Sequence, residues 1–125
     1  PHYYNYDLMR KLAGDKQMTD VWRMPAIAPW EKSCGKHPTQ KPLALMVRAL
    51  LASTKENALV LDPFAGSGST GIAANLIGRR FIGIEREQKF IEMAVKRRTQ
   101  MEVMGATWAT KIKDINVSRV HFKHC

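Results

Sequence analysis

Cysteine is scarce in this chain, and long apolar runs are absent. The only cysteines, Cys34 and Cys125, lie too far apart in the sequence to indicate a disulfide-stapled scaffold. Cys34 is close to His37, but a structural zinc site needs four ligands and no second pair is spaced to match, so we expect no metal. No stretch reaches the length of a membrane span and no signal-peptide pattern opens the chain, so we expect a cytoplasmic location.

Acidic residues are also few, with 11 Asp and Glu against 20 Lys and Arg and a net charge of +9. Such a charge favours a polyanionic partner, because phosphate contacts release counterions and supply much of the affinity for nucleic acid. Solubility alone is the other interpretation. With 125 residues the chain can form one small domain at most, with a modest core.

The residues that are present centre on a glycine-rich turn, Asp-Pro-Phe-Ala-Gly-Ser-Gly-Ser-Thr-Gly at 62–71. The apolar run 58–61 before it predicts a buried strand, and 72–77 after it predicts a helix that ends at Gly78. A strand, a glycine turn and a helix start bring bare backbone and free N–H groups close to a ligand. The turn is therefore predicted to be a binding site.

The residues of the turn discriminate among ligands. A phosphate-binding P-loop needs Lys-Ser/Thr after its last glycine, and no lysine is present here. The glycines at 66, 68 and 71 fit the spacing of a dinucleotide site, with Glu85 at a plausible distance for a ribose. Asp62 argues against a dinucleotide, because its carboxylate stands where a pyrophosphate would approach. An acid at that position suits a cationic ligand.

A second strand is predicted over 81–84, ending in Glu85. A carboxylate at this strand end can accept two hydrogen bonds from a ribose diol, although it could also serve the first turn of the next helix. That helix is predicted over 87–104, and we expect the basic cluster 96–98 to be a solvated part of it. Its apolar face is predicted to consist of Phe90, Ala94, Met101 and Met104, widened by Ile91 and Val95.

Upstream, apolar residues at 43, 46, 47, 50 and 51 predict an amphipathic helix that begins at Pro42 and packs on the sheet. This places Thr39 near the strand ends, where it either caps the helix or contacts a ligand, and the two roles are compatible. A shorter helix is predicted over 3–12, ended by Gly14. Its tyrosines either pack against another segment or contact nucleic acid.

The segment Asp-Pro-Phe-Ala-Gly-Ser-Gly-Ser-Thr resembles motif I of the S-adenosylmethionine-dependent amino-group DNA methyltransferases, which methylate adenine N6 or cytosine N4. His-Pro-Thr-Gln-Lys-Pro at 37–42 resembles motif X, and Gly-Ile-Glu-Arg at 83–86 resembles motif II. Motif X before motif I resembles the permuted β-type order, in which the catalytic half and the target-recognition region come first. The resemblance covers roughly residues 20–100.

The resemblance implies an α/β fold: a partial Rossmann-like methyltransferase fold with a three-layer αβα architecture and an incomplete sheet. It implies that residues 1–36 are the end of the target-recognition region with a linker, and that 37–104 form the cofactor-binding subdomain. Residues 105–125 are expected to be a tail of uncertain structure, disordered or loosely packed.

The implied cofactor is S-adenosyl-L-methionine, with Asp62 facing its cationic end and Glu85 binding its ribose. No catalytic residue is assigned. The residues implied to bind the cofactor are His37, Pro38, Thr39, Gln40, Lys41, Asp62, Pro63, Phe64, Ala65, Gly66, Ser67, Gly68, Ser69, Thr70, Glu85 and Arg86.

A complete enzyme of this family also carries an Asp/Asn/Ser-Pro-Pro-aromatic motif, and no Pro-Pro pair occurs here. We therefore expect a fragment of a site-specific DNA methyltransferase, from a restriction-modification, phage or orphan system, that is inactive alone. Adenine N6 is favoured as the target; the alternatives are cytosine N4 and a non-catalytic remnant that holds cofactor or DNA. The expected partners are double-stranded DNA and the missing N-terminal catalytic half, on the same or a separate chain, with a homodimer in the intact enzyme.

Overall fold

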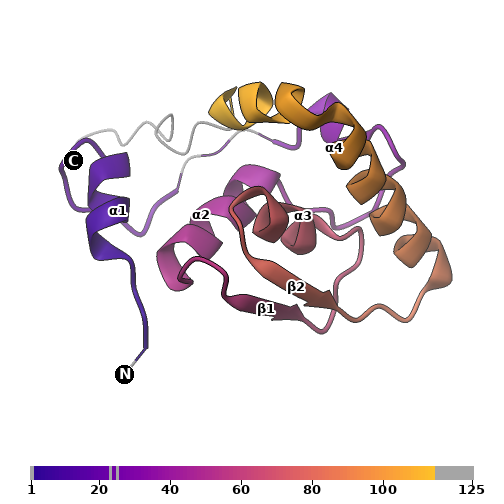
Figure 1. The fold of residues 1–125 in the computed structure, drawn as a ribbon, viewed down its shortest axis with the longest axis horizontal. Helices are drawn as coiled ribbons and strands as arrows, with labels where there is room; N and C mark the ends of the chain where they lie inside the picture. Colours follow the sequence, from indigo (N-terminus) through magenta and orange to yellow (C-terminus); the bar gives the residue numbers. More distant parts are fainter. Residues whose placement is uncertain (1, 23, 25, 115–125) are drawn as a thin grey trace.

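The structure is a computed structural model that describes residues 2–22, 24 and 26–114. The elements, in chain order, are α1 (Tyr6–Leu12), the 3-10 helix η1 (Pro29–Lys32), α2 (Leu43–Ser53), β1 (Leu59–Asp62), α3 (Ser69–Leu76), β2 (Arg80–Gly83) and α4 (Gln88–Asp114), and Figure 1 shows their arrangement. Helices and strands alternate from α2 onward. The α/β class predicted from the sequence is confirmed.

The strands β1 and β2 form a two-stranded parallel sheet in which Leu59 pairs with Arg80 and Asp62 with Gly83. Parallel neighbours need a crossover connection, and α3 supplies it. Because the strands run in the same direction, their carboxyl ends meet at one edge of the sheet. The pairing continues past the strands, since the Ile84 N–H donates to the Asp62 carbonyl at 2.9 Å. The incomplete sheet is thus as predicted.

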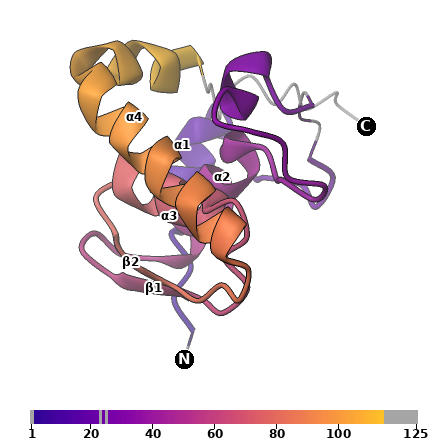
Figure 2. The same ribbon diagram turned by 90° about the vertical axis from the view of Figure 1, so that its right-hand side faces the viewer.

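The helices α2, α3 and α4 lie over one face of this sheet (Figures 1 and 2). Strand periodicity turns Val60 toward the helices, whereas Leu59 and Leu61 on either side are 54% and 60% exposed. In the described part of the chain, the opposite face of the sheet has no helix over it. The buried core consists of Leu43, Val47, Leu50, Val60, Ile72, Ala73 and Ala74.

The last helix differs from its prediction in length and in its buried face. It continues through Gly105 to Asp114, so the boundary expected at residue 104 is wrong for the described residues; the rest of the expected tail, 115–125, lies outside them. A glycine inside a helix costs only about 1 kcal/mol relative to alanine, and alanines follow at 106 and 109. Ile91 and Val95, expected to widen the apolar face, are 37% and 58% exposed.

The first helix is shorter than predicted, because it begins at Tyr6 rather than at residue 3. Met9 is its buried residue, at 2% exposure, and the Asn5 N–H donates to the Ala52 carbonyl at 2.8 Å, which ties this segment to the end of α2. Tyr3 and Tyr4 are 39% and 51% exposed. Both interpretations of the tyrosines therefore stay open.

Two glycines with the same backbone conformation give a test of how closely α4 packs. Gly68, which precedes α3, has φ +76°, and a Cβ there would lie 2.8 Å from the Ala94 Cβ. Gly78 has φ +71° with nothing within 4 Å of such a Cβ. We expect Gly78→Ala to lower the free energy of unfolding by about 1–2 kcal/mol from left-handed strain alone. Gly68→Ala should lose about 1–3 kcal/mol more, because the added methyl overlaps Ala94.

Urea unfolding of the two variants measures this difference. Equal losses at Gly68 and Gly78 would show that α4 can move away from the turn at little cost.

Candidate functional site

A cavity of about 300 Å³ lies at the carboxyl end of β1, between the segment 37–41 and the glycine turn. The structure thus brings together two segments that lie more than twenty residues apart in the sequence. The residues that line the cavity are His37, Thr39, Gln40, Lys41, Met46, Asp62, Phe64, Ala65, Gly66, Ser67, Ser69 and Thr70. All of them except Met46, which comes from α2, belong to the set predicted from the sequence.

The carboxylate of Asp62 closes the turn. Its Oδ1 accepts the Phe64 N–H at 3.0 Å, and its Oδ2 accepts the Thr70 hydroxyl at 2.6 Å. These two bonds tie the end of β1 to the first turn of α3, where the helix dipole favours a negative charge. Asp62 therefore shapes the turn and places a negative charge beside the cavity.

Glu85 connects the turn to the start of α4. Its Oε2 accepts the Gly66 N–H at 2.9 Å, and its Oε1 accepts the Glu87 N–H at 2.8 Å. These backbone hydrogen bonds, that from Glu87 first, lower the pKa of the Glu85 carboxyl below its ordinary value, and the nearby His37 acts in the same direction. A carboxylate offers about four lone-pair sites, so both oxygens retain acceptor capacity for a ligand hydroxyl. The residue does not itself line the cavity.

The lowered pKa of Glu85 predicts a pH-dependent stability. A carboxyl whose folded pKa is depressed stabilises the fold at pH values above its ordinary 4.5, and this contribution is lost as the pH falls through the folded pKa. We expect Glu85→Gln to be less stable than the unsubstituted protein at neutral pH, with the difference shrinking below pH 4.5.

Urea unfolding at a series of pH values tests this, with Glu56→Gln as the control. Glu56 is exposed in the turn before β1 and makes none of these contacts. A difference for Glu85→Gln that stays constant into the acid range would contradict the assignment.

The segment 37–41 lies directly against the turn. The ring of His37 packs on Phe90 of α4 with centroids 4.2 Å apart, and its Nδ1 accepts the Thr39 N–H at 3.2 Å. A Cβ at Gly66 would lie 3.2 Å from His37 Nε2, so only a glycine fits between them without displacement. Lys41 Nζ donates to the Thr39 carbonyl at 3.2 Å, which holds the segment in a compact curve.

Thr39 does not cap α2, because a residue that the sequence did not indicate takes that role. Glu31 of η1 is 8% exposed, and its Oε2 accepts the Leu43 N–H at 2.9 Å while its Oε1 accepts the Ala28 N–H at 3.2 Å. The Gln40 Nε2 also donates to the Glu31 carbonyl at 2.9 Å. Glu31 therefore fixes the path of the chain into α2, and with it the wall of the cavity.

Gln40 has a buried amide oxygen close to the cavity. It is 8% exposed, and its Oε1 has no hydrogen-bond partner among the described residues. A buried amide oxygen without a partner is unfavourable, by about 1–3 kcal/mol, unless a ligand or water bonds to it. Gln40 is part of the lining of the cavity, but this oxygen is itself buried.

Arg97 is not part of a solvated surface, contrary to the prediction for the cluster 96–98. It is 5% exposed, and its Nη1 donates to the Ser67 carbonyl at 2.6 Å and to the hydroxyls of Ser67 and Ser69, each at 3.1 Å. Burial lowers the pKa of its guanidinium, and the charge of Glu31 opposes that shift. The helical spacing could have indicated this burial, because position 97 lies on the same face of α4 as Ala94 and Met101.

The other predicted site residues lie beside the cavity or away from it. Pro38 and Pro63 are exposed, and Gly68 is buried behind the turn. The side chain of Arg86 is 93% exposed and pairs with Glu87 at 3.4 Å. Cys34 donates to the Gln100 Oε1 at 2.9 Å, and the described residues contain no group of three side chains able to hold a metal ion.

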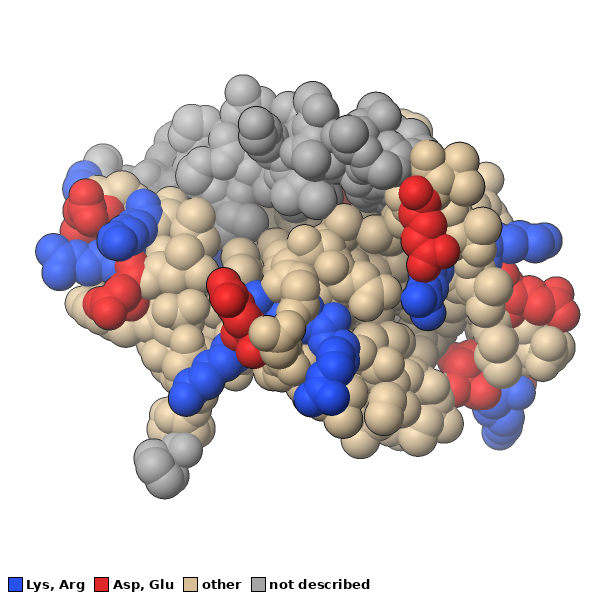
Figure 3. Space-filling model, in the orientation of Figure 1, with Lys and Arg blue, Asp and Glu red and all other residues tan. Residues whose placement is uncertain are grey.

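The basic charge is dispersed on the face shown in Figure 3, where Lys and Arg side chains alternate with acidic and uncharged residues. No continuous basic surface is visible on that face. In the part of the chain that the structure describes, no helix has the length and apolar character needed to cross a membrane.

A parallel strand, glycine turn, helix and strand, with one acid at the end of β1 and another just beyond β2, is the arrangement found in Rossmann-like α/β folds. A family model described as DNA methylase matches residues 2–96. The chain therefore belongs to the DNA methylase family, as the motifs predicted.

Curated relatives and a solved structure agree with this assignment. The chain is 60% identical over 97 residues to the type II methyltransferase M2.MboI of Moraxella bovis and 56% identical over 96 residues to M2.DpnII of Streptococcus pneumoniae. These matches cover 78% and 77% of this chain but 36% of each relative. The crystal structure of the M1.HpyAVI–SAM complex is similar, with a TM-score of 0.53 and 50% identity over 56% of this chain and 33% of that one.

Proposed function

We propose that this chain is the cofactor-binding part of a DNA methyltransferase that transfers the methyl group of S-adenosyl-L-methionine to adenine N6. The observation that carries the proposal is the cavity in which the segment 37–41 faces the glycine turn, with Asp62 at its edge. The similar structure of M1.HpyAVI is a complex with SAM, which supports the same ligand here.

The residues around the cavity fit the chemistry of this cofactor. Asp62 suits its cationic amino group, and we propose that the segment 64–68 lines its amino-acid moiety. The free N–H groups at the start of α3 suit its carboxylate. Glu85, on the same edge of the sheet, has acceptor capacity for the ribose hydroxyls. Pro38, Pro63, Gly68 and Arg86 stay in the proposed set although, like Glu85, they do not line the cavity.

The cofactor supplies an electrophilic methyl group, and the base must be flipped out of the duplex for its exocyclic nitrogen to reach that group. The residues of this chain hold and orient the methyl donor, so their contribution is proximity rather than acid or base chemistry. Polarising the amino group would require the Pro-Pro-aromatic motif, which the 125 residues lack. That step belongs to the catalytic half.

The proposed partners follow from this division. We propose double-stranded DNA as the substrate and the cytoplasm as the location. The catalytic half completes the base pocket, on the same or a separate chain. We propose residues 1–36 as the end of the target-recognition region and 37–104 as the cofactor-binding subdomain. A homodimer of the intact enzyme is part of the same proposal.

Methylation by the intact protein tests the proposal. Incubation with unmethylated genomic DNA and labelled S-adenosylmethionine, followed by nucleoside mass analysis, should give N6-methyladenine. N4-methylcytosine without N6-methyladenine would overturn the choice of base. Binding of cofactor with no modified base would favour the non-catalytic alternative.

A further inference from the structure

Helix α4 supports the glycine turn from the side opposite the cavity. Ala94 packs against Gly68, where a Cβ would come within 2.8 Å of the Ala94 Cβ. One helical turn later, Arg97 Nη1 donates to the Ser67 carbonyl and to the hydroxyls of Ser67 and Ser69. Ser67 and Ser69 line the cavity, whereas Arg97 does not. The arginine therefore reaches the site only through these two residues.

The burial of Arg97 beside the start of α3 does not stabilise that helix. A positive charge near the N-terminus of α3 opposes the helix dipole, and a buried guanidinium loses the solvation that it has in water. A nearby acid, Glu31, partly compensates the charge. At this position the Arg97 guanidinium can donate to both Ser67 and Ser69, the residues on either side of Gly68. These hydrogen bonds fix the shape of the turn.

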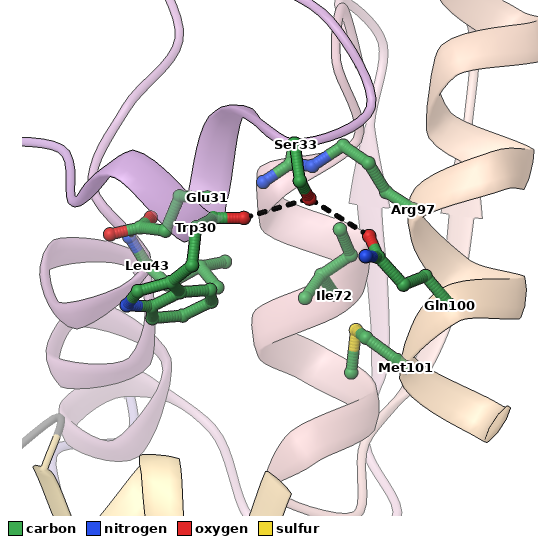
Figure 4. Close-up of a pocket in the computed structure, with 8 residues that line it drawn as sticks. All are labelled: Trp30, Glu31, Ser33, Leu43, Ile72, Arg97, Gln100 and Met101. Carbon is green, nitrogen blue, oxygen red and sulfur yellow. Dashed lines mark hydrogen bonds between the residues drawn. The ribbon is translucent and has the colours of Figure 1, made fainter. Parts of the chain in front are cut away.

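The surroundings of Arg97 hold it in place. Figure 4 shows Glu31 and Trp30 of η1 on one side and Arg97 and Gln100 of α4 on the other. The Ser33 hydroxyl joins the two sides, with bonds of 2.9 Å to the Trp30 carbonyl and 3.0 Å to the Gln100 Oε1. Arg97 thus belongs to the seam between η1 and α4, and η1 carries the acid that fixes the segment 37–41.

We propose that Arg97 is a positioning residue, which holds Ser67 and Ser69 so that the glycine turn keeps the shape that binds the cofactor. This inference rests on the proposed function. The guanidinium acts through the turn and touches neither the methyl donor nor the base. Its loss should therefore weaken cofactor binding and leave the chemical step at saturating cofactor intact.

The test compares Arg97→Met, Arg97→Lys and the control Arg98→Met in the intact protein. Arg98 is the adjacent arginine of α4; its side chain is 66% exposed and pairs with Glu102, so its loss removes the same charge without removing a hydrogen bond to Ser67 or Ser69. Calorimetry with S-adenosylmethionine should give a Kd about tenfold or more higher for Arg97→Met, because a charged donor to buried acceptors is lost. Arg97→Lys should recover part of this affinity, and Arg98→Met should bind like the unsubstituted protein.

Kinetics separate positioning from a general loss of structure. KM for the cofactor should rise in Arg97→Met while kcat at saturating cofactor stays nearly unchanged. Failure of the unsubstituted protein to bind S-adenosylmethionine would refute the proposed function instead. If the unsubstituted protein binds and Arg97→Met binds equally well, or loses kcat alone, the positioning role is wrong.

A second comparison applies if Arg97→Met does not fold. Ser69→Ala removes one acceptor of Arg97, and its effect on cofactor affinity can be measured in both the unsubstituted and the Arg97→Lys background. A positioning role requires the two effects to be coupled, with a smaller loss from Ser69→Ala when lysine stands at 97. Strictly additive effects would overturn the proposal.

Discussion

Asp62→Ala should weaken the binding of S-adenosylmethionine by the intact protein about a hundredfold or more, because each hydrogen bond to a charged group contributes about 1.5–3 kcal/mol. The substitution removes the acceptor of the Phe64 N–H and of the Thr70 hydroxyl, so the turn loses both ties to the end of β1. It also removes the negative charge that we propose faces the cofactor's cationic end. Calorimetric titration with the cofactor measures the loss.

Two further variants separate these contributions. Asp62→Asn keeps the shape of the side chain and removes its charge, whereas Thr70→Val removes one hydrogen bond and leaves the charge. We expect Asp62→Asn to lose more affinity than Thr70→Val if the charge contacts the ligand. Glu56→Ala, in an exposed turn away from the cavity, is the control. Undiminished binding by both Asp62→Ala and Glu85→Ala would sink the assignment of the site.

The local part of this architecture could be predicted because each signal lies within a few residues. The apolar run before Asp62 and the apolar run before Glu85 indicated strands, and the glycines between them indicated a turn into a helix. The structure places both acids at the same edge of a parallel sheet, which follows once the two strands are known to be parallel. Short-range patterns therefore located the glycine turn and its two acids, whereas the segment 37–41 was assigned from its resemblance to motif X.

The supporting charges could not be predicted, because their partners are distant in the sequence. Glu31 accepts from an N–H 12 residues away, and Arg97 donates to a carbonyl 30 residues away. Arg48 of α2 is likewise fully buried, with its guanidinium carbon 4.0 Å from the centre of the Trp22 ring. A charged residue in a periodic pattern is usually assigned to the solvated face, and only the tertiary packing shows that these are inside.

The length of α4 was mispredicted for a different reason. The predicted helix ended at residue 104, just before Gly105, but a single glycine only weakens a helix and alanines follow at 106 and 109. The face of α4 that meets the turn was also narrower than the sequence pattern suggested. Arg97, predicted to belong to a solvated cluster, lies buried on that face, and Val95, predicted to be apolar surface of it, is exposed.

Among the described residues, the face of the sheet that has no helix over it exposes apolar side chains. Leu59 and Leu61 of β1 and Ile82 of β2, with Ile84 just beyond it, are between 49% and 60% exposed on one side. Exposed apolar surface of this kind marks a region that packs against other structure. The chain spans 36% of the curated relatives that it matches. We therefore expect the 125-residue chain to need a partner segment before it can form a complete base pocket.

The isolated 125-residue chain should transfer no methyl group to DNA, even with saturating S-adenosylmethionine. The chain has no Pro-Pro pair, so it lacks the carboxylate or amide oxygen and the proline carbonyl that the family motif supplies to the target amino group. Positioning the methyl donor alone leaves the attacking nitrogen in the base stack, out of reach. The measurement is tritium transfer from labelled cofactor to unmethylated genomic DNA, with the intact protein as the positive control. Transfer by the isolated chain above the no-enzyme background would show that the chain contains a methyl-transfer site of its own.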